Sequence, residues 1–415
     1  MNILIISHFF PPHKGGLETA SFYTAKKLSE FGHKVVILTS KCNDEIRDFH
    51  MMSDILVYRF KSYNLPEFKK LPQSSSFGIM LMAFFKLPYI VKLHNIQIIH
   101  AEGHVFPVTL FSYLLNQFIF KRPMFISVQG RLQFGYMGII EHIFDKIITK
   151  HIYHKSDKII CASKSLKERL LKYKINEKKM IVIPNGVDTH TFTRKEKGTF
   201  FDQFLKGKED YKKILFVGRL DKQKGIEYLI KAIPYVINNY KKTHFFILGS
   251  ERQGNIEFYL RSLVEKLNIQ PYLTFIDPLT IKHKNSRIFQ IEKHFQEISK
   301  IYSSADIFCL PSLHEGFPLS IAEALSIGLI IVASKAEGIP EAVKENINGF
   351  LAEPGNVPQL IEKILKALNL SEEETNNISK NNIILAKKKY SWDVIVKSIE
   401  IEYIKSFKKV SIKCV

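Results

Sequence analysis

The sequence predicts an α/β protein with two doubly wound domains, each built on a parallel β-sheet. Its 415 residues exceed the roughly 100–200 residues of a typical single domain. Short apolar runs alternate with stretches of helical periodicity along the whole chain, which is typical of βαβ units. A polar stretch without clear periodicity, residues 191–210, separates two such series. We therefore expect two separate cores, with the domain boundary in that stretch.

The elements of the first series follow one another as strand and helix. Strands are expected at residues 2–7, 34–39, 55–60, 96–100, 124–128, 158–162 and 180–183. Helices are expected at 18–31, where Gly32 would close the helix, and at 108–120. Residues 1–195 are therefore assigned to an N-terminal domain.

The second series predicts a C-terminal domain over residues 205–390. Its strands are expected at 213–217, 244–248, 272–275, 307–310 and 329–333. The last segment, from Trp392, has apolar residues at helical spacing and should bury one face of a helix. These residues are Val394, Ile395, Ile399, Ile401 and Ile404. Doubly wound sheets bind ligands at the carboxyl ends of their strands, so two such sheets face to face would form a central cleft.

The composition excludes several classes of protein. The chain is 46% apolar and 24% charged, as in ordinary globular proteins. No run reaches the roughly 18 apolar residues that a spanning helix needs. Residues 2–7 lack the features of a signal peptide and are interpreted as a strand. The four cysteines include no CxxC pair, which indicates neither a zinc site nor a disulfide framework, so a location in the reducing cytoplasm is expected.

The net charge of +20 is distributed unevenly. Residues 1–200 hold 29 Lys and Arg against 15 Asp and Glu, and the remainder holds 31 against 25. Such a field attracts phosphates, nucleic acid or acidic lipid headgroups, and it also fits a merely solubilising surface. The charge alone names no partner.

The most informative stretch is residues 311–328, which reads as a loop and a helix after a strand. Gly316 and Pro318 keep the loop irregular, and Ser320 can cap the helix. Free N–H groups near Leu319 and Ser320 would then suit an anionic phosphate. Glu315 on the loop and Glu323 in the first helical turn would offer carboxylates to the hydroxyls of the same ligand. A sugar nucleotide has both kinds of group.

A second cluster, residues 218–225, follows the strand at 213–217. Gly218 permits close approach at the strand end, and Arg219 and Lys224 supply two cations for a diphosphate. Cleaving a sugar from a nucleoside diphosphate builds negative charge on the leaving group, which a metal ion or fixed cations must neutralise. The sequence has no Asp-x-Asp pair for magnesium, so we expect no metal and no cofactor.

These motifs resemble those of retaining glycosyltransferases of family 4, which have the GT-B architecture of two Rossmann-like domains facing a central cleft. The resemblance runs in order along nearly the whole chain, through residues 11–18, 184–188, 218–225, 315–323, 338–341 and 390–392. It implies transfer of a hexosyl group from a UDP- or GDP-sugar with retention of configuration. The acceptor would be a glycan or a lipid-linked molecule, as in surface polysaccharide or glycolipid synthesis. The family's last helix returns to the N-terminal domain, which would place residues 392–415 there.

The resemblance also implies residue roles in the donor site. Arg219 and Lys224 would contact the diphosphate, Glu323 the ribose and Glu315 the transferred sugar. Front-face attack, with the leaving phosphate accepting the acceptor's proton, would make the two cations most important for rate. The other expected donor-binding residues are Gly15, Gly16, Gly218, Gly316, Phe317, Leu319 and Ser320.

The acceptor side is less clearly marked. Family members often have a catalytic-site histidine where this chain has Glu102, so either Glu102 or the nearby His104 would fill that role. Gln129 stands where relatives often have histidine and is expected to form hydrogen bonds. Asn185, in the Pro-Asn-Gly-Val-Asp segment at 184–188, is also assigned to the acceptor or cleft region.

Residues 58–91 mix basic and aromatic side chains. A surface helix of this kind could rest on the inner face of an anionic membrane, and a core helix flanked by lysines would show the same pattern. Nucleic acid is not an expected partner. Two other interpretations remain open, namely a synthase of a soluble disaccharide phosphate or storage glucan, and a non-catalytic nucleotide-sugar-binding protein.

Overall fold

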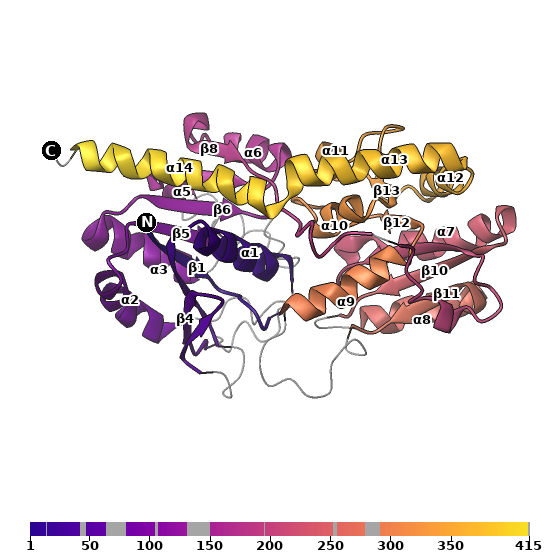
Figure 1. Ribbon diagram of the computed structural model, residues 1–415, viewed down its shortest axis with the longest axis horizontal. Helices are drawn as coiled ribbons and strands as arrows, with labels where there is room; N and C mark the ends of the chain where they lie inside the picture. The colour runs from indigo at the N-terminus through magenta and orange to yellow at the C-terminus, as the bar shows by residue number, and fades with distance from the viewer. Residues whose placement is uncertain are drawn as a thin grey trace. The chain divides into compact units, whose positions relative to one another are not determined.

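The computed structural model describes residues 1–13, 15–41, 47–63, 80–103, 107–130, 150–194, 196–251, 255–278 and 291–413. The chain divides into two compact units (Figure 1). Unit 1 comprises Met1–Asn185 and Trp392–Val415, and unit 2 comprises Gly186–Ser391. Each unit is an α/β domain with its own sheet, which confirms the predicted fold class.

The sheet of unit 1 has the strand order β3-β4-β2-β1-β5-β6-β7-β8. Its strands are β1 (Asn2–Ser7), β2 (Lys34–Ser40), β3 (Phe49–Met52), β4 (Ile55–Phe60), β5 (Ile98–Glu102), β6 (Met124–Val128), β7 (Lys158–Cys161) and β8 (Met180–Val182). All neighbours pair in parallel except β3 and β4, because β3 is an antiparallel edge strand that the sequence did not predict. The chain reverses its direction of winding between β1 and β5, and such switch points bind ligands at the strand ends.

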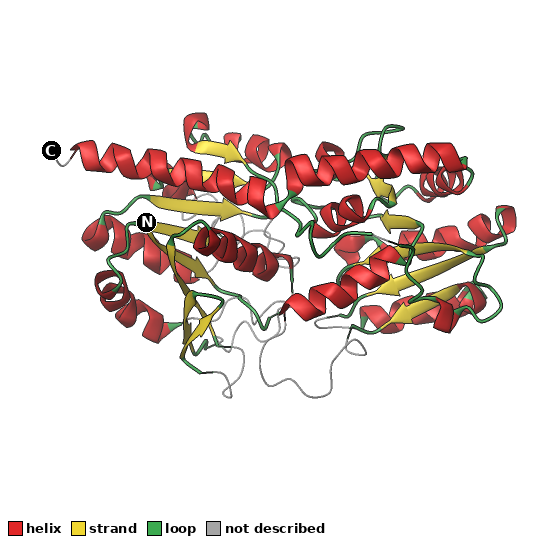
Figure 2. Ribbon diagram, viewed as in Figure 1, coloured by secondary structure: helices red, strands yellow, loops and turns green. Residues whose placement is uncertain are grey.

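Helices lie on both faces of this sheet (Figure 2). They are α1 (Gly16–Glu30), α2 (Leu81–Leu93), α3 (Pro107–Leu115) with the π-helical η3 (Asn116–Phe120), α5 (Lys150–Lys155), α6 (Lys164–Leu171) and α14 (Trp392–Lys413). The central strands are apolar and fully enclosed, as expected of a parallel sheet covered on both faces.

The last helix, α14, packs on α1 within unit 1. The rings of Trp392 and Tyr23 stack with centroids 5.5 Å apart, and His33 Nε2 lies 2.8 Å from Glu400 Oε1. Of the apolar face predicted here, Ile395 and Ile399 are buried. Val394 and Ile401 are exposed instead, because the observed buried face also takes in Val396 and Tyr403.

The sheet of unit 2 is parallel throughout and has the order β11-β10-β9-β12-β13-β14. Its strands are β9 (Lys212–Val217), β10 (Thr243–Leu248), β11 (Leu273–Ile276), β12 (Ile307–Leu310), β13 (Ile330–Ser334) and β14 (Gly349–Ala352). Its α-helices are α7 (Ile226–Asn239), α8 (Ile256–Lys266), α9 (Ile291–Ser303), α10 (Leu319–Ile327), α11 (Ile339–Ala342), α12 (Val357–Leu368) and α13 (Glu372–Leu385). The switch point lies between β9 and β12, the two strands that precede the predicted donor motifs.

The sequence placed the domain boundary within residues 191–210, whereas the chain divides between Asn185 and Gly186. Residues 187–194 already pack on unit 2. The Val187 N–H donates to the Tyr390 carbonyl, and the buried Phe192 ring meets the Tyr302 ring with centroids 5.8 Å apart.

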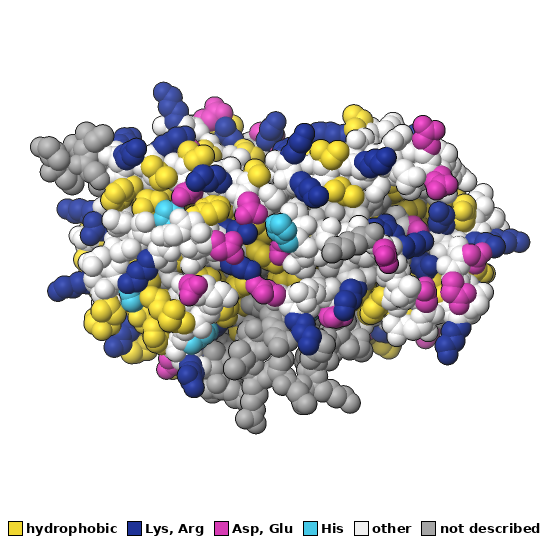
Figure 3. Space-filling view, in the orientation of Figure 1, with side chains coloured by type: hydrophobic (Ala, Val, Ile, Leu, Met, Phe, Trp, Pro, Cys, Tyr) yellow, Lys and Arg dark blue, Asp and Glu magenta, His cyan; other side chains and the backbone are white. Residues whose placement is uncertain are grey.

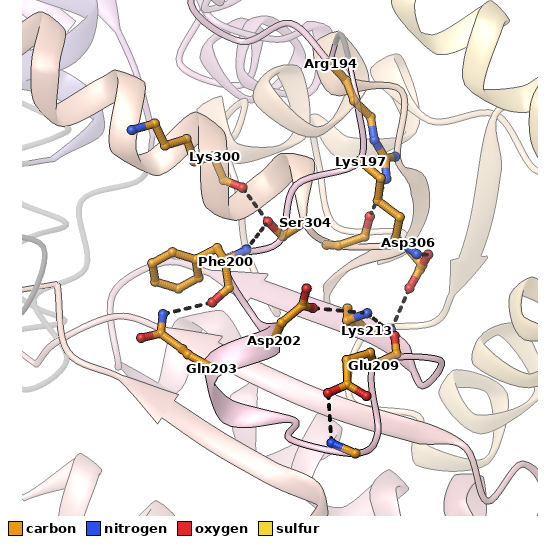
Figure 4. Close-up of polar contacts among 12 residues, drawn as sticks. Arg194, Lys197, Phe200, Asp202, Gln203, Glu209, Lys213, Lys300, Ser304 and Asp306 are labelled. Atoms are coloured by element: carbon orange, nitrogen blue, oxygen red, sulfur yellow. Dashed lines mark hydrogen bonds and ion pairs between the residues drawn. The ribbon is translucent and has the colours of Figure 1, made fainter.

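The polar residues that follow hold the chain to the start of β9 and β12 (Figure 4). Arg194 donates to the Ala305 carbonyl, and Lys197 Nζ pairs with Asp306 Oδ1 at 2.8 Å. Asp306 Oδ2 in turn accepts from the Lys213 backbone N–H. The polarity of this stretch therefore marks a fixed segment of unit 2.

Candidate active site

The turn after β9 places two cations at the switch point of unit 2. Asp221 caps a single 3₁₀ turn, η7 (Lys222–Lys224), by accepting from the Lys224 N–H, and its other oxygen lies 3.0 Å from Arg219 Nη2. Gly225 then takes the left-handed conformation, with φ of 63°. A Cβ at Gly225 would lie 2.1 Å from the Pro311 carbonyl oxygen. Glycine is therefore required where this turn approaches the loop after β12.

Lys224 reaches from this turn to the loop after β12. Its Nζ lies 2.5 Å from Glu315 Oε1, and both side chains are largely buried. Ser312 Oγ donates to the same carboxylate oxygen at 2.8 Å. The Glu315 carbonyl accepts from the Gly338 N–H. The ammonium group is thus fixed in position, and so it can stabilise a neighbouring anion without first being ordered.

Helix α10 begins beside this pair. Its N-cap is Pro318, and no side chain caps it. The prediction that Ser320 caps the helix was therefore wrong, because the helix already begins at Leu319. Phe317 is buried against Tyr390, with ring centroids 5.1 Å apart, which holds the preceding loop. An uncapped helix start presents its first N–H groups to an anion.

Glu323 lies in the second turn of α10, one turn further along than predicted. Its Oε2 accepts a hydrogen bond of 2.7 Å from the Tyr302 hydroxyl, which comes from α9. Enclosure by protein raises the pKa of Glu323 to about 7, and the bond from Tyr302 partly opposes that rise. The structure thus joins Lys224 to Glu315 directly and gives Arg219 and Glu323 other partners.

In unit 1, a buried polar cluster lies at the ends of β5 and β6. Glu102 is the last residue of β5 and is paired in register with Ser7, the last residue of β1. The two strands lie on either side of the switch point. Its Oε2 accepts a long hydrogen bond of 3.4 Å from Gln129 Nε2. Its Oε1 lies 3.6 Å from His100 Nε2.

The other partners of His100 keep its ring in place. Nε2 lies 2.7 Å from Ser127 Oγ, and Nδ1 lies 2.5 Å from the Tyr403 hydroxyl of α14. Burial lowers the pKa of His100 to about 3 and raises that of Glu102 to about 7. Glu102 is therefore the group of this cluster that can exchange a proton near neutral pH.

The remaining predicted site residues fall in three places. Gly15 is the N-cap of α1 and Gly16 is its first residue, so both lie at a helix start after β1. Asn185 is buried where unit 1 ends. His104 lies outside the described residues. Within those residues, no group of three or more His, Cys, Asp or Glu side chains could hold a metal ion.

Two family models match consecutive parts of the chain. The model of Glycosyltransferase Family 4 matches residues 14–191, and that of Glycosyl transferases group 1 matches residues 199–384. The chain belongs to the family 4-like glycosyltransferases.

Relatives and solved structures agree with this assignment. This glycosyltransferase is 28% identical to an uncharacterised glycosyltransferase of Methanocaldococcus jannaschii, with 96% of both chains covered. It is also 28% identical to a human subunit of phosphatidylinositol N-acetylglucosaminyltransferase, covering all of this chain and 77% of the relative. Sucrose-phosphate synthase from Thermosynechococcus elongatus shares the GT-B fold, with a TM-score of 0.77 at 19% identity over 98% of this chain and 99% of the other. The Anabaena protein HepE, solved with UDP, has a TM-score of 0.75 at 18% identity, over 98% of this chain and 100% of the other.

Sequence reasoning missed several residues that hold the polar side chains of the glycosyltransferase's two clusters. Ser312 and Tyr302 hold the two glutamates, and Ser127 and Tyr403 hold His100. Ser312 could have been noticed, because it lies three residues before Glu315 in the same loop. Tyr302 and Tyr403 carry no local signal, since they reach their partners from helices distant in the sequence.

Proposed function

We propose that the protein transfers a hexosyl group from a nucleoside-diphosphate sugar to a glycan or lipid-linked acceptor, with retention of anomeric configuration. The observation that carries this proposal is the pairing of Lys224 and Glu315 at the switch point, beside the uncapped start of α10. A fixed cation and free helix N–H groups suit a diphosphate, and the neighbouring carboxylates suit sugar hydroxyls.

In this proposal the enzyme acts by neutralising charge on the leaving group. The acceptor hydroxyl attacks the anomeric carbon from the face that the diphosphate leaves. The bond between that carbon and the phosphate oxygen breaks, and the departing phosphate takes the hydroxyl proton. The products are a glycoside and a nucleoside diphosphate. Arg219, Lys224 and the start of α10 stabilise the developing charge, and no metal ion or cofactor is required.

The other donor contacts follow from the positions of the two glutamates. Glu315 serves two purposes, since it holds Lys224 and also accepts from hydroxyls of the transferred sugar. Glu323, oriented by Tyr302, accepts from the ribose. Gly218 lets the backbone at the end of β9 approach the diphosphate. Gly225 lets the turn that carries Lys224 pack against the Pro311 carbonyl.

In the proposed reaction, residues of unit 1 bind the acceptor. Glu102, whose pKa of about 7 allows it to hold or release a proton at neutral pH, interacts with an acceptor hydroxyl, and Gln129 supplies a further hydrogen bond. Ser127, His100 and Tyr403 are positioning residues for this pair.

The donor and acceptor classes draw support from the similar proteins. HepE was solved with UDP and with UDP-glucose, which favours a UDP-sugar among the possible donors. Several relatives are named as subunits of phosphatidylinositol N-acetylglucosaminyltransferase, which favours a lipid acceptor. We propose accordingly that the enzyme works in glycolipid or surface polysaccharide synthesis, from the cytoplasmic face of a membrane.

The decisive experiment measures release of nucleoside diphosphate in the presence of a metal chelator. The protein is incubated with UDP-, GDP- and ADP-sugars and a lipid extract as acceptor, and the product's anomeric configuration is read by NMR. Release with one donor class, together with a retained configuration, is expected. Binding of a donor with no turnover would support a non-catalytic protein instead, and turnover only after a divalent ion is added would contradict the role given to Arg219 and Lys224.

A further inference from the structure

Helix α2 is apolar on two opposite faces. Its inner face is formed by Ala83, Leu87, Ile90 and Val91, which are buried in unit 1. Its outer face carries a second apolar row at four-residue intervals, which aligns side chains along a helix. This row consists of Leu81, Phe85, Tyr89 and Leu93, with Met82 beside it, and each residue is about half exposed or more. A surface helix of a water-soluble domain normally carries polar residues there.

The end of the α3–η3 helix extends this surface. The Phe84 ring of α2 packs against the Phe111 ring of α3, with centroids 5.5 Å apart, so the two helices are neighbours. Leu114 and Phe118 follow Phe111 at spacings of three and seven residues, which keeps them on one side of the helix. Phe118 is 79% exposed, and Ile119 beside it is 59% exposed. Figure 3 shows apolar side chains gathered over the α2 region of unit 1.

The exposed charged side chains on α2 and directly after η3 are all basic. Lys86 and Lys92 lie on α2, and Lys121 and Arg122 follow η3, and all four are exposed. In the part of the chain that the structure describes, none of them forms an ion pair. The one acidic residue between positions 80 and 123 is Glu102, which is only 2% exposed. Lys86 Nζ also lies 5.9 Å from the centre of the Tyr89 ring, within the apolar row.

We infer that this surface docks into the headgroup and upper acyl layer of an anionic lipid bilayer. It is defined by Leu81, Met82, Phe85, Tyr89, Leu93, Leu114, Phe118 and Ile119 with the four cations. The apolar rows enter the boundary between headgroups and acyl chains, and the cations meet the lipid phosphates. No described helix is long and apolar enough to span a membrane.

The charge pattern decides between a bilayer and a protein partner. A second copy of the chain would bring the same four cations to the interface, and like charges facing each other oppose association. An anionic bilayer supplies the opposite charge over the whole surface. The use of such docking rests on the proposed function, because a lipid-linked acceptor would lie in that bilayer. The docking itself needs neither donor nor acceptor.

Sedimentation with lipid vesicles tests the surface directly. The full chain is expected to bind vesicles of phosphatidylcholine with phosphatidylglycerol and to bind phosphatidylcholine alone much less. Phe85→Glu with Phe118→Glu should weaken binding at least tenfold, and each of Lys86→Gln and Lys121→Gln by roughly fivefold. The matched control is Phe258→Glu on α8, because Phe258 is 75% exposed and lies in unit 2. Its binding should equal that of the unsubstituted protein.

A fluorescence experiment separates insertion from adsorption. The single tryptophan, Trp392, is buried, so an introduced tryptophan reports on its own surroundings. Emission of Phe118→Trp should shift to shorter wavelength with anionic vesicles, and that of Phe258→Trp should not. Equal binding to neutral and anionic vesicles, an unchanged Phe118→Trp spectrum, or a dimer in solution that Phe85→Glu dissociates would each overturn the inference. UDP binding is measured on the same variants, and it should be unchanged because these substitutions leave the donor site intact. A failure of membrane docking can thus be told apart from a failure of the proposed donor site.

Discussion

Lys224 is the residue on which the proposed chemistry depends most directly. Its ammonium group is held by Glu315 and lies at the switch point. Replacing Lys224 therefore removes a fixed positive charge from the place that the proposal gives to the leaving diphosphate. Lys224→Ala should lower kcat by about a hundredfold to a thousandfold, the range observed when one preorganised donor is removed. Turnover assays with the nucleotide sugar that supports product formation in the donor screen would measure the effect.

Lys222 provides the matched control for this prediction. It belongs to the same 3₁₀ turn but is exposed. Lys222→Ala should therefore change kcat little, although it removes the same charge from the same turn. Equal losses in the two variants would show that the general positive field matters rather than the position of Lys224.

The raised pKa of Glu102 predicts how stability depends on pH. Its folded pKa is about 7 against an ordinary 4.5, because burial disfavours the charged form. Between pH 4.5 and 7, Glu102 is ionised in the unfolded chain but still protonated in the folded protein. The free energy of unfolding therefore falls as the pH rises through this range. Glu102→Gln should remove at most about 3 kcal/mol of this fall. Urea unfolding of both proteins across that range measures it, and parallel curves for the two would contradict the prediction.

At the residue scale, the sequence singled out the two partners of an ion pair without predicting that they meet. Lys224 and Glu315 were both singled out, and they touch. The sequence could not reveal that Glu323 meets Tyr302, because Tyr302 stands in no recognised motif. Separation along the chain is not the reason, since Lys224 and Glu315 are 91 positions apart and belong to two different motifs.

At the scale of elements, the turn at Gly225 joins β9 to α7 and sets the position of Lys224. Gly225→Ala should destabilise the fold and reduce donor binding, because its Cβ would meet the Pro311 carbonyl. Gly355→Ala is the matched control. Gly355 also has a positive φ, of 77°, but a Cβ there meets nothing closer than 3.6 Å. Gly355→Ala should lower the free energy of unfolding by about 1 kcal/mol, the cost of a left-handed backbone conformation alone. Equal losses of stability for the two variants in thermal unfolding would contradict the role of the clash.

The strands that the sequence missed are short or atypical. Strand β14 has four residues and begins at Gly349, which fits closely against β13 and is a poor strand former. Strand β3 alternates half-buried and exposed residues at an antiparallel edge. By contrast, β1, β4, β6 and β12 were predicted with the observed bounds, because each is a continuous run between turn residues.

At the scale of the whole molecule, the division of the chain depends on a few specific contacts. Val187, before the polar stretch 191–210, and Phe192, at its start, already pack in unit 2, and a hydropathy pattern does not reveal this. The return of the chain to unit 1 at Trp392 is similarly fixed by the stacking on Tyr23. Aromatic and backbone contacts of individual residues mark both crossings, and average composition does not reveal such contacts.

This division predicts where a nucleotide should stabilise the chain. The proposed donor residues all belong to unit 2 apart from Gly15 and Gly16, so bound UDP or GDP should slow amide hydrogen exchange at residues 218–225 and 311–323. At a ligand concentration a hundredfold above Kd, the protection should approach about 2.7 kcal/mol. Lys224→Ala should lose it and Lys222→Ala should keep it, whereas β3 and β4 of unit 1 should exchange at unchanged rates in every case. Protection confined to unit 1 would place the nucleotide elsewhere and remove the basis for the roles given to Arg219, Lys224 and Glu323.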